Sequence, residues 1–364
     1  MSAKSDNSRI LIRFMPSLSH LASVRVAVPL YLNFNIETLN EAWADIQQEN
    51  PTAAIEDSEN DLLMKYRAKA HLLSIPGHLR KMVLETVKAL REEFNRCQIE
   101  HPYMGIDKLP FCLRYDGTMD RDKMARQVVA NESICIRKRF HLACVYNMRK
   151  CMWTLWKEML ASGNRRNVEM ARTFFRIRKQ DGLATAGLEF PIFENDPEIW
   201  FPRMKSVLPG IKSEDRWKLF SCFHLATDDD FLHTLYSVSK EEEEQMLKIH
   251  CKSALRLHLE WPRQSLFLET ADKLWNFIDV ESFRFLLKCI FVQKAQKEDY
   301  DYGKILEDFW NKSPDHLKEG AKEDQNLRRI INSYFNGLRE KRNADEGGRR
   351  SSRKKKRRLV EVKV

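Results

Sequence analysis

Glycine is scarce in this sequence, with 12 residues among 364. Doubly wound α/β enzymes need glycines in their phosphate loops and at close helix–strand contacts. The chain also has few alternating strand patterns, and the best of them, residues 133–140 (SICIRKRF), continues into a helical pattern. These shortages predict an all-α protein and argue against a doubly wound enzyme.

Motifs that carry enzymatic chemistry are absent as well. The sequence has no G-x-x-x-x-G-K-[ST] loop, no G-x-S-x-G elbow, no H-E-x-x-H pair and no kinase signature. Cys97 with His101, and Cys144 with His141, have the helical spacing of a nucleophile and its base, but no third group orients them. We therefore predict that the chain is not an enzyme and holds no cofactor. An enzyme of unknown class is the second alternative.

The eight cysteines are scattered and form no C-x-x-C pair. This usage is typical of a reduced intracellular chain rather than of a disulfide scaffold. Cys222, His224, His250 and Cys251 contain the residue types of a zinc site, which needs four convergent ligands. Residues one or two positions apart on a helix do not face each other, so we expect no metal site.

Long hydrophobic runs are lacking. The apolar stretch at 21–32 (LASVRVAVPLYL) is interrupted by Arg25 and Pro29. It is shorter than the roughly 20 apolar residues that span a bilayer, so we expect no membrane partner.

Helical periodicity is clearest in the second half of the chain. Apolar residues at i, i+3, i+4, i+7 and i+8 predict a helix around Phe283, Leu286, Leu287, Ile290 and Phe291. Similar patterns at 267–278 and 327–338 predict two more, and an apolar stripe over 140–159 predicts one helix of about five turns.

Two further residue patterns predict where helices begin. Ser239 precedes four glutamates at 241–244, which are favourable near a helix N-terminus. Ser313 followed by Pro314 has the order expected of an N-cap residue and a first helical residue.

Aromatic residues recur near the ends of the expected helices, and their later intervals are 35 to 44 residues. They are Trp43, Trp156, Trp200, Tyr236, Trp275 and Trp310. A period near 40 residues with two helices per unit is typical of α-solenoids. We therefore predict a divergent helical-repeat array of roughly eight or nine helix pairs, with an irregular helical bundle as the alternative.

The expected organisation follows from these patterns and from loop composition. We expect an N-terminal helical region at 1–99, a loop or boundary at 100–118 and a helical-repeat region at 119–338. Residues 339–364 are expected to form a disordered basic tail, and they carry 12 Lys/Arg against 4 Asp/Glu. This tail accounts for +8 of the net charge of +10, so the body is nearly neutral.

The tail resembles a bipartite nuclear-import signal. Two basic residues, a ten-residue spacer and a dense basic cluster follow one another in the sequence. The residues are Lys341, Arg342, Arg353, Lys354, Lys355, Lys356, Arg357 and Arg358. Basic side chains of this kind bind between acidic and aromatic groups of a carrier, and the polar spacer lets both clusters reach their pockets. We expect a nuclear-import carrier as partner and a nuclear location; a cytoplasmic location is the alternative.

Two further hypotheses concern charge. Ser352 follows Arg349 and Arg350 in a context that resembles a kinase site, and phosphate there would weaken the basic cluster. The first alternative function is a nucleic-acid-associated protein that is anchored to phosphates by the basic tail and by a basic helix at 164–179, where four basic residues lie on one helical side. They are Arg165, Arg172, Arg176 and Lys179.

The leading prediction is a non-catalytic intracellular protein–protein interaction scaffold or adaptor. Its specificity is expected on a concave helical face or on the loops at 100–118 and 180–202. The sequence names no protein partner and indicates no oligomeric state.

Overall fold

The computed structural model describes residues 9–48, 59–101, 111–163, 203, 205, 208, 211–212, 216–221, 226–297 and 299–338. Within these residues every regular element is a helix, and β structure is limited to one antiparallel bridge between Leu113 and Met119. The prediction of an all-α fold is therefore confirmed.

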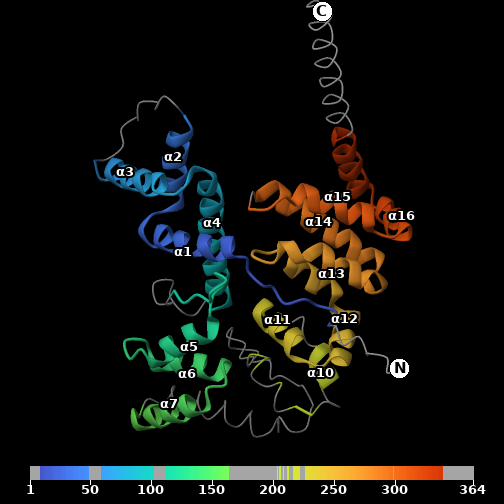
Figure 1. The fold of residues 1–364 in the computed structure, drawn as a ribbon. Coiled ribbons are helices and arrows are strands. Elements are labelled where there is room, and N and C mark those ends of the chain that lie inside the picture. The colour runs from blue at the N-terminus through green and yellow to red at the C-terminus, as the bar shows by residue number, and fades with distance from the viewer. Residues whose placement is uncertain are drawn as a thin grey trace, which may run out of the picture.

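The first four helices form the upper left part of the molecule in Figure 1. They are α1 (Leu18–Asn33), α2 (Ile36–Gln47), α3 (Glu59–Leu73) and α4 (Gly77–Glu100). α1 packs along α4, and α2 packs against α3. Leu30, Leu39, Leu72 and Leu90 are buried in the core that these helices share.

Three shorter helices lie below the end of α4 (Figure 1). They are α5 (Arg121–Ala130), α6 (Ile136–Val145) and α7 (Arg149–Ala161). Their core includes Val128, Phe140 and Met159, together with Cys97 near the end of α4. The 24-residue α4 thus contributes side chains to two successive cores and joins them.

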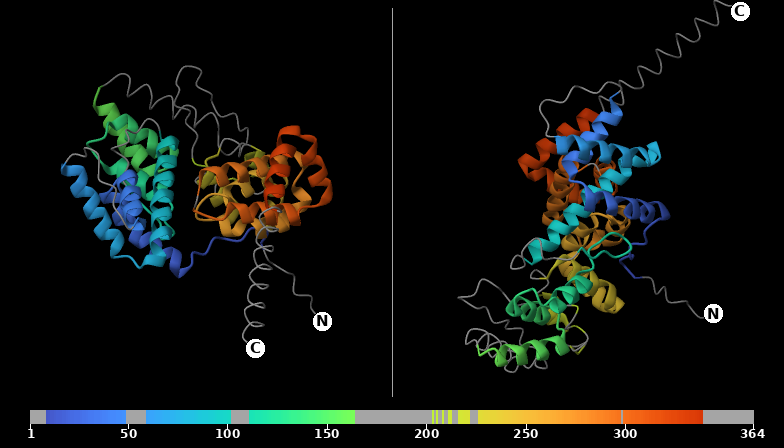
Figure 2. Two further views of the ribbon diagram at one scale, coloured as in Figure 1. Left: turned by 90° about the horizontal axis from the view of Figure 1, so that it is seen from above. Right: turned by 90° about the vertical axis from the view of Figure 1, so that its left-hand side faces the viewer.

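The remaining helices form the right-hand part of Figure 1. They are α10 (Arg216–Ser221), α11 (Asp228–Ser237), α12 (Lys240–His258), η5 (Gln264–Leu266), α13 (Phe267–Leu274), η6 (Trp275–Phe277), α14 (Val280–Gln296), α15 (Tyr302–Lys312) and α16 (Asp315–Glu323). Residues 325–338 are also helical. Seen from above, this part lies beside the α1–α7 part (Figure 2, left).

Several helix predictions are confirmed in detail. α14 buries Phe283, Leu286 and Leu287 on one face, as the apolar spacing predicts. Ser239 begins α12 through a capping box: its side chain accepts a hydrogen bond from the Glu242 backbone N–H, and the Glu242 carboxylate accepts one from Ser239.

Two boundaries differ from the prediction. The stripe over 140–159 belongs to α6 and α7, because the chain turns at Asn147, which has a φ of 51°. Asparagine tolerates this left-handed conformation, and both helices still contribute apolar residues to one core. Ser313 ends α15 instead of beginning α16, whose N-cap is Pro314.

Residues 9–16, which we call the N-terminal strap, cross from α1 to the α11–α12 region (Figure 1). The Arg9 guanidinium donates hydrogen bonds to the backbone carbonyls of Tyr236 and Val238, at the end of α11. The buried Glu243 carboxylate accepts a hydrogen bond from the Leu11 backbone N–H at 2.8 Å. Leu11 is itself buried in the core of the right-hand part, so the strap ties the two parts together.

A second contact between the two parts is made by residues of the right-hand part that pack on the α1–α4 core. Trp261, which follows α12, packs against the α1–α4 core, and its ring lies 5.3 Å from that of His20. Gly117, with a φ of 86°, makes room for this ring, because a Cβ atom there would overlap it. Next to Trp261, the Glu260 carboxylate pairs with Arg96 of α4 at 3.6 Å.

Candidate functional site

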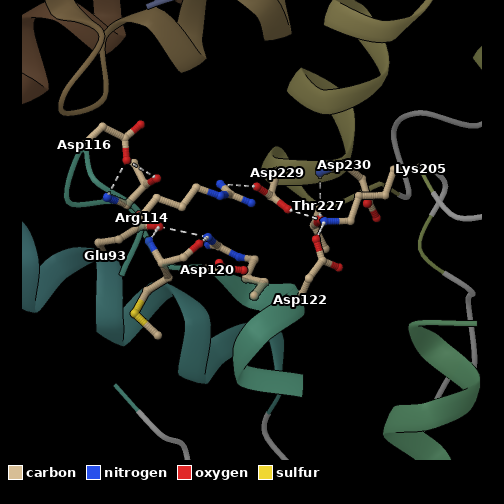
Figure 3. Close-up of polar contacts among 12 residues, drawn as sticks. Glu93, Arg114, Asp116, Asp120, Asp122, Lys205, Thr227, Asp229 and Asp230 are labelled. Carbon is tan, nitrogen blue, oxygen red and sulfur yellow. Dashed lines mark hydrogen bonds and ion pairs between the residues drawn. The ribbon is translucent and has the colours of Figure 1, made fainter. Parts of the chain in front are cut away.

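Charged side chains gather where α4 and α5 meet the start of α11 (Figure 3). We call this set the junction network. It consists of Glu93, Glu100, Arg114, Arg121, Asp122, Arg203, Lys205, Asp229 and Asp230. Most of these side chains are largely shielded from solvent, so each charge depends on its partners for stabilisation.

Arg121 is the centre of one half of the network. Its Nε and Nη2 donate to the two carboxylate oxygens of Glu100 at 2.7 and 2.8 Å, which is a bidentate pair. Its Nη1 donates to Glu93 at 2.8 Å. The guanidinium thereby fastens the first residue of α5 to two residues of α4 that lie about two helical turns apart.

Arg203 is the centre of the other half. Its guanidinium donates to Asp229 at 2.7 Å, to Asp230 at 3.0 Å and to Glu100 at 3.3 Å. It also lies 5.2 Å from the centre of the Tyr146 ring, a cation–π distance. One side chain therefore links α4, the end of α6 and α11.

The sequence at the start of α11 accounts for the positions of Asp229 and Asp230. Thr227 caps α11 by accepting a hydrogen bond from the Asp230 backbone N–H, so Asp229 and Asp230 lie in the first helical turn. The helix N-terminus favours negative charge there. Asp229 also pairs with Arg114 at 3.0 Å and with Lys205 at 3.1 Å.

The shifted pKa values of Asp229, Glu100 and Arg121 keep these three groups ionised at neutral pH. Burial alone would raise the pKa of Asp229, but Arg121 and Arg203 hold it well below its ordinary value. Burial would likewise raise the pKa of Glu100, and the same arginines lower it. The pKa of Arg121 is raised well above its ordinary value because Glu100 and Glu93 outweigh the effect of burial.

Beside the network, Cys97 and His101 form one of the two pairs with nucleophile–base spacing. Burial raises the pKa of the Cys97 thiol to about 12 and lowers the pKa of His101 to about 4. The His101 Nε2 lies 3.0 Å from the Tyr146 hydroxyl. A protonated thiol and a neutral imidazole are the opposite of the thiolate–imidazolium pair that nucleophilic catalysis uses.

The His101 pKa leads to a prediction about pH. The pKa of His101 is near 4 in the folded chain and about 6.5 in the unfolded chain, so the unfolded chain takes up the proton first. The free energy of unfolding therefore has its full value above pH 6.5 and decreases as the pH falls. At pH 5.5 this loss is about 1.4 kcal/mol, and few carboxylates have begun to titrate. We expect His101→Gln to reduce the stability lost between pH 7.5 and 5.5 by about that amount, as measured by urea unfolding.

The matched control for this experiment is His316→Gln, at an exposed position of α16. If His101→Gln and His316→Gln both leave the pH dependence of the free energy of unfolding unchanged, the conclusion that His101 is buried in its neutral form is wrong.

The sequence-predicted site residues lie outside the described residues. This holds for Lys341, Arg342, Ser352 and the cluster 353–358, and for Arg165, Arg172, Arg176 and Lys179. The loop at 180–202 also lies outside them, whereas residues 111–118 of the other loop contribute Arg114 to the junction network.

The candidate zinc residues are described in part. Cys222 and His224 lie outside the described residues. The His250 Nε2 lies 2.7 Å from the Phe220 carbonyl, and the Cys251 thiol donates to the Phe277 carbonyl. Among the residues that the structure describes, no group of three or more metal-ligating side chains gathers.

Sequence reasoning missed the junction network. The available signal was local: three aspartates at 228–230 follow Thr227, an N-cap residue type. Their partners lie 24 to 115 residues away along the chain, and no periodic pattern relates them.

Comparison with protein-family models, curated proteins and solved structures gave no match. No helix in the described part of the chain is long and apolar enough to cross a bilayer.

Proposed function

We propose that this chain is a non-catalytic intracellular protein–protein interaction scaffold or adaptor that acts in the nucleus. The observation that carries the proposal is the junction network. Its charged groups are paired, most are buried, and the pKa values of Glu100, Arg121 and Asp229 are shifted away from neutral pH, which suits a clamp that fixes helical surfaces relative to one another. Acid–base catalysis needs groups that titrate near the operating pH.

We further propose that the helices from α11 to α16 belong to a divergent repeat array. Support comes from the way that alternate helices stack: α12 packs on α14 and α14 packs on α16, while α13 packs on α15. Tyr236, Trp275 and Trp310 lie near the ends of α11, α13 and α15 and follow one another after 39 and 35 residues. Stacked helices of this kind offer extended surfaces to partners.

Nuclear import is proposed from the basic tail, and fluorescent fusions test it. We expect the full-length fusion to accumulate in the nucleus and a fusion truncated after Leu338 to lose this accumulation. Lys354→Ala with Lys355→Ala removes two charges from the dense cluster and is expected to act like the truncation. Ser352→Asp adds a negative charge beside the cluster and is expected to lower the nuclear-to-cytoplasmic ratio.

Arg349→Ala with Arg350→Ala is the matched control, because it removes two charges from the spacer between the clusters. Equal distributions of the full-length and truncated fusions would refute nuclear import through the tail. Equal loss from both double variants would favour a general charge effect, such as retention on nucleic acid, over carrier recognition.

A further inference from the structure

Helix α3 has two apolar faces, only one of which is covered. Its inner face includes Ala68 and Leu72, which are fully buried. On the outer side, Leu63 is 48% exposed, Tyr66 69% and Leu73 50%. A helix that is apolar on both sides is normally covered on both sides, so the outer face has the composition of a contact surface.

The exposed residues form one continuous stripe along the helix. Leu63, Tyr66, Ala70 and Leu73 are spaced at i, i+3, i+7 and i+10, and all four are exposed. We call them the α3 stripe. It spans about 15 Å, or roughly three helical turns, which matches the anchor spacing of a helix laid alongside. In Figure 1, α3 lies at the outer edge of the α1–α4 part, away from α10–α16.

The edges of the stripe are basic. From 62 to 73 the chain carries Lys65, Arg67, Lys69 and His71 and no acid. On a helical projection, Arg67 borders the stripe on the side of Leu63, and Lys69 borders it on the side of Leu73. Lys65 already pairs with Asp45 at 3.2 Å. Within the described residues, Arg67 and Lys69 make no ion pair, so both charges are available to a partner.

We propose that the α3 stripe binds an amphipathic helix of a partner protein whose apolar side is flanked by acidic residues. This inference rests on the proposed interaction function and names the surface and the partner chemistry. Apolar anchors would cover Tyr66 and Leu73, while carboxylates on either edge pair with Arg67 and Lys69. The charges select the partner, and the Tyr66 ring, which the partner covers, supplies most of the affinity.

The test uses the full chain and a labelled synthetic peptide of about 21 residues, with leucine at heptad positions a and d and glutamate at e and g. A second peptide carries lysine in place of glutamate. By fluorescence anisotropy, we expect the glutamate peptide to bind at least about tenfold more tightly than the lysine peptide, with a preference that weakens in high salt.

Variants place the binding on α3. We expect Tyr66→Ala to weaken binding of the glutamate peptide at least about tenfold. Tyr115→Ala removes an equally exposed tyrosine from the 111–120 loop and should leave the affinity for this peptide unchanged. Arg67→Glu with Lys69→Glu should reverse the preference toward the lysine peptide.

The proposal is overturned if neither peptide binds, if the two peptides bind equally well, or if the glutamate peptide binds the Tyr66→Ala chain as tightly as the unchanged chain. The last result would indicate that the basic tail binds the peptide. Binding of anionic phospholipid vesicles through Tyr66, without binding of the glutamate peptide, would overturn it in favour of a membrane surface. The localisation of the fusions is independent of Tyr66, so a failure here does not refute the proposed nuclear function.

Discussion

Replacing Arg121 with alanine is expected to lower the free energy of unfolding by about 3–5 kcal/mol, because the change leaves two buried carboxylates without their partner. The Arg121 side chain is almost fully buried and makes three hydrogen bonds, of 2.7 to 2.8 Å, to Glu100 and Glu93. Urea unfolding followed by circular dichroism measures the change. Arg121→Lys keeps the charge but loses the bidentate geometry, so we expect an intermediate loss.

Two controls separate burial from charge. Arg91→Ala breaks a pair with Glu37 in which both side chains are well exposed, and should cost no more than about 1 kcal/mol. Arg121→Met combined with Glu93→Gln and Glu100→Gln removes the uncompensated charges and should recover much of the stability lost in Arg121→Ala. Equal stability of Arg121→Ala and Arg91→Ala would show that the junction network does not hold α4 and α5 together.

Replacing Phe309 with alanine is expected to cost about 3–5 kcal/mol through the cavity that it leaves. Phe309 lies on α15 and is fully buried. The ring centroids of Phe267, Trp275 and Phe283 lie 5.1 to 5.2 Å from its own. Aromatic pairs at this distance add to the effect of burial, so one side chain supports α13, α14 and α15 together.

Thermal and urea unfolding both report this loss. Phe309→Leu keeps most of the apolar volume and should cost less than half as much. Val292→Ala, at a half-exposed position on α14, is the matched surface truncation and should change stability by no more than about 0.5 kcal/mol. A loss for Phe309→Ala that is no larger than for Val292→Ala would contradict the placement of Phe309 at the centre of this core.

The parts of the fold that could be predicted from the sequence are those with a local cause. The face of α14 follows from apolar spacing, and the start of α12 follows from Ser239 and the glutamates after it. The break between α6 and α7 escaped prediction because Asn147 interrupts the backbone without interrupting the apolar stripe.

The candidate site could not be predicted, because its members are brought together only by the tertiary fold. Arg203 and Glu100 are 103 residues apart in the sequence. Arginine and glutamate are residue types that usually lie on the surface, so neither residue alone indicates a buried site. Glu243 illustrates the same limit. The four glutamates at 241–244 suit a helix start, yet only the fold reveals that Glu243 is buried and binds the N-terminal strap.

The N-terminal strap also sets an order of events during synthesis of the chain. Arg9 precedes Tyr236, its hydrogen-bond partner, by 227 residues. At ribosomal speeds of roughly 5–20 residues per second, the strap waits about 10 to 45 seconds for Tyr236 to be synthesised. Helices α1–α4 are complete long before then. The core of the right-hand part is therefore finished only when newly made helices capture a segment that left the ribosome much earlier.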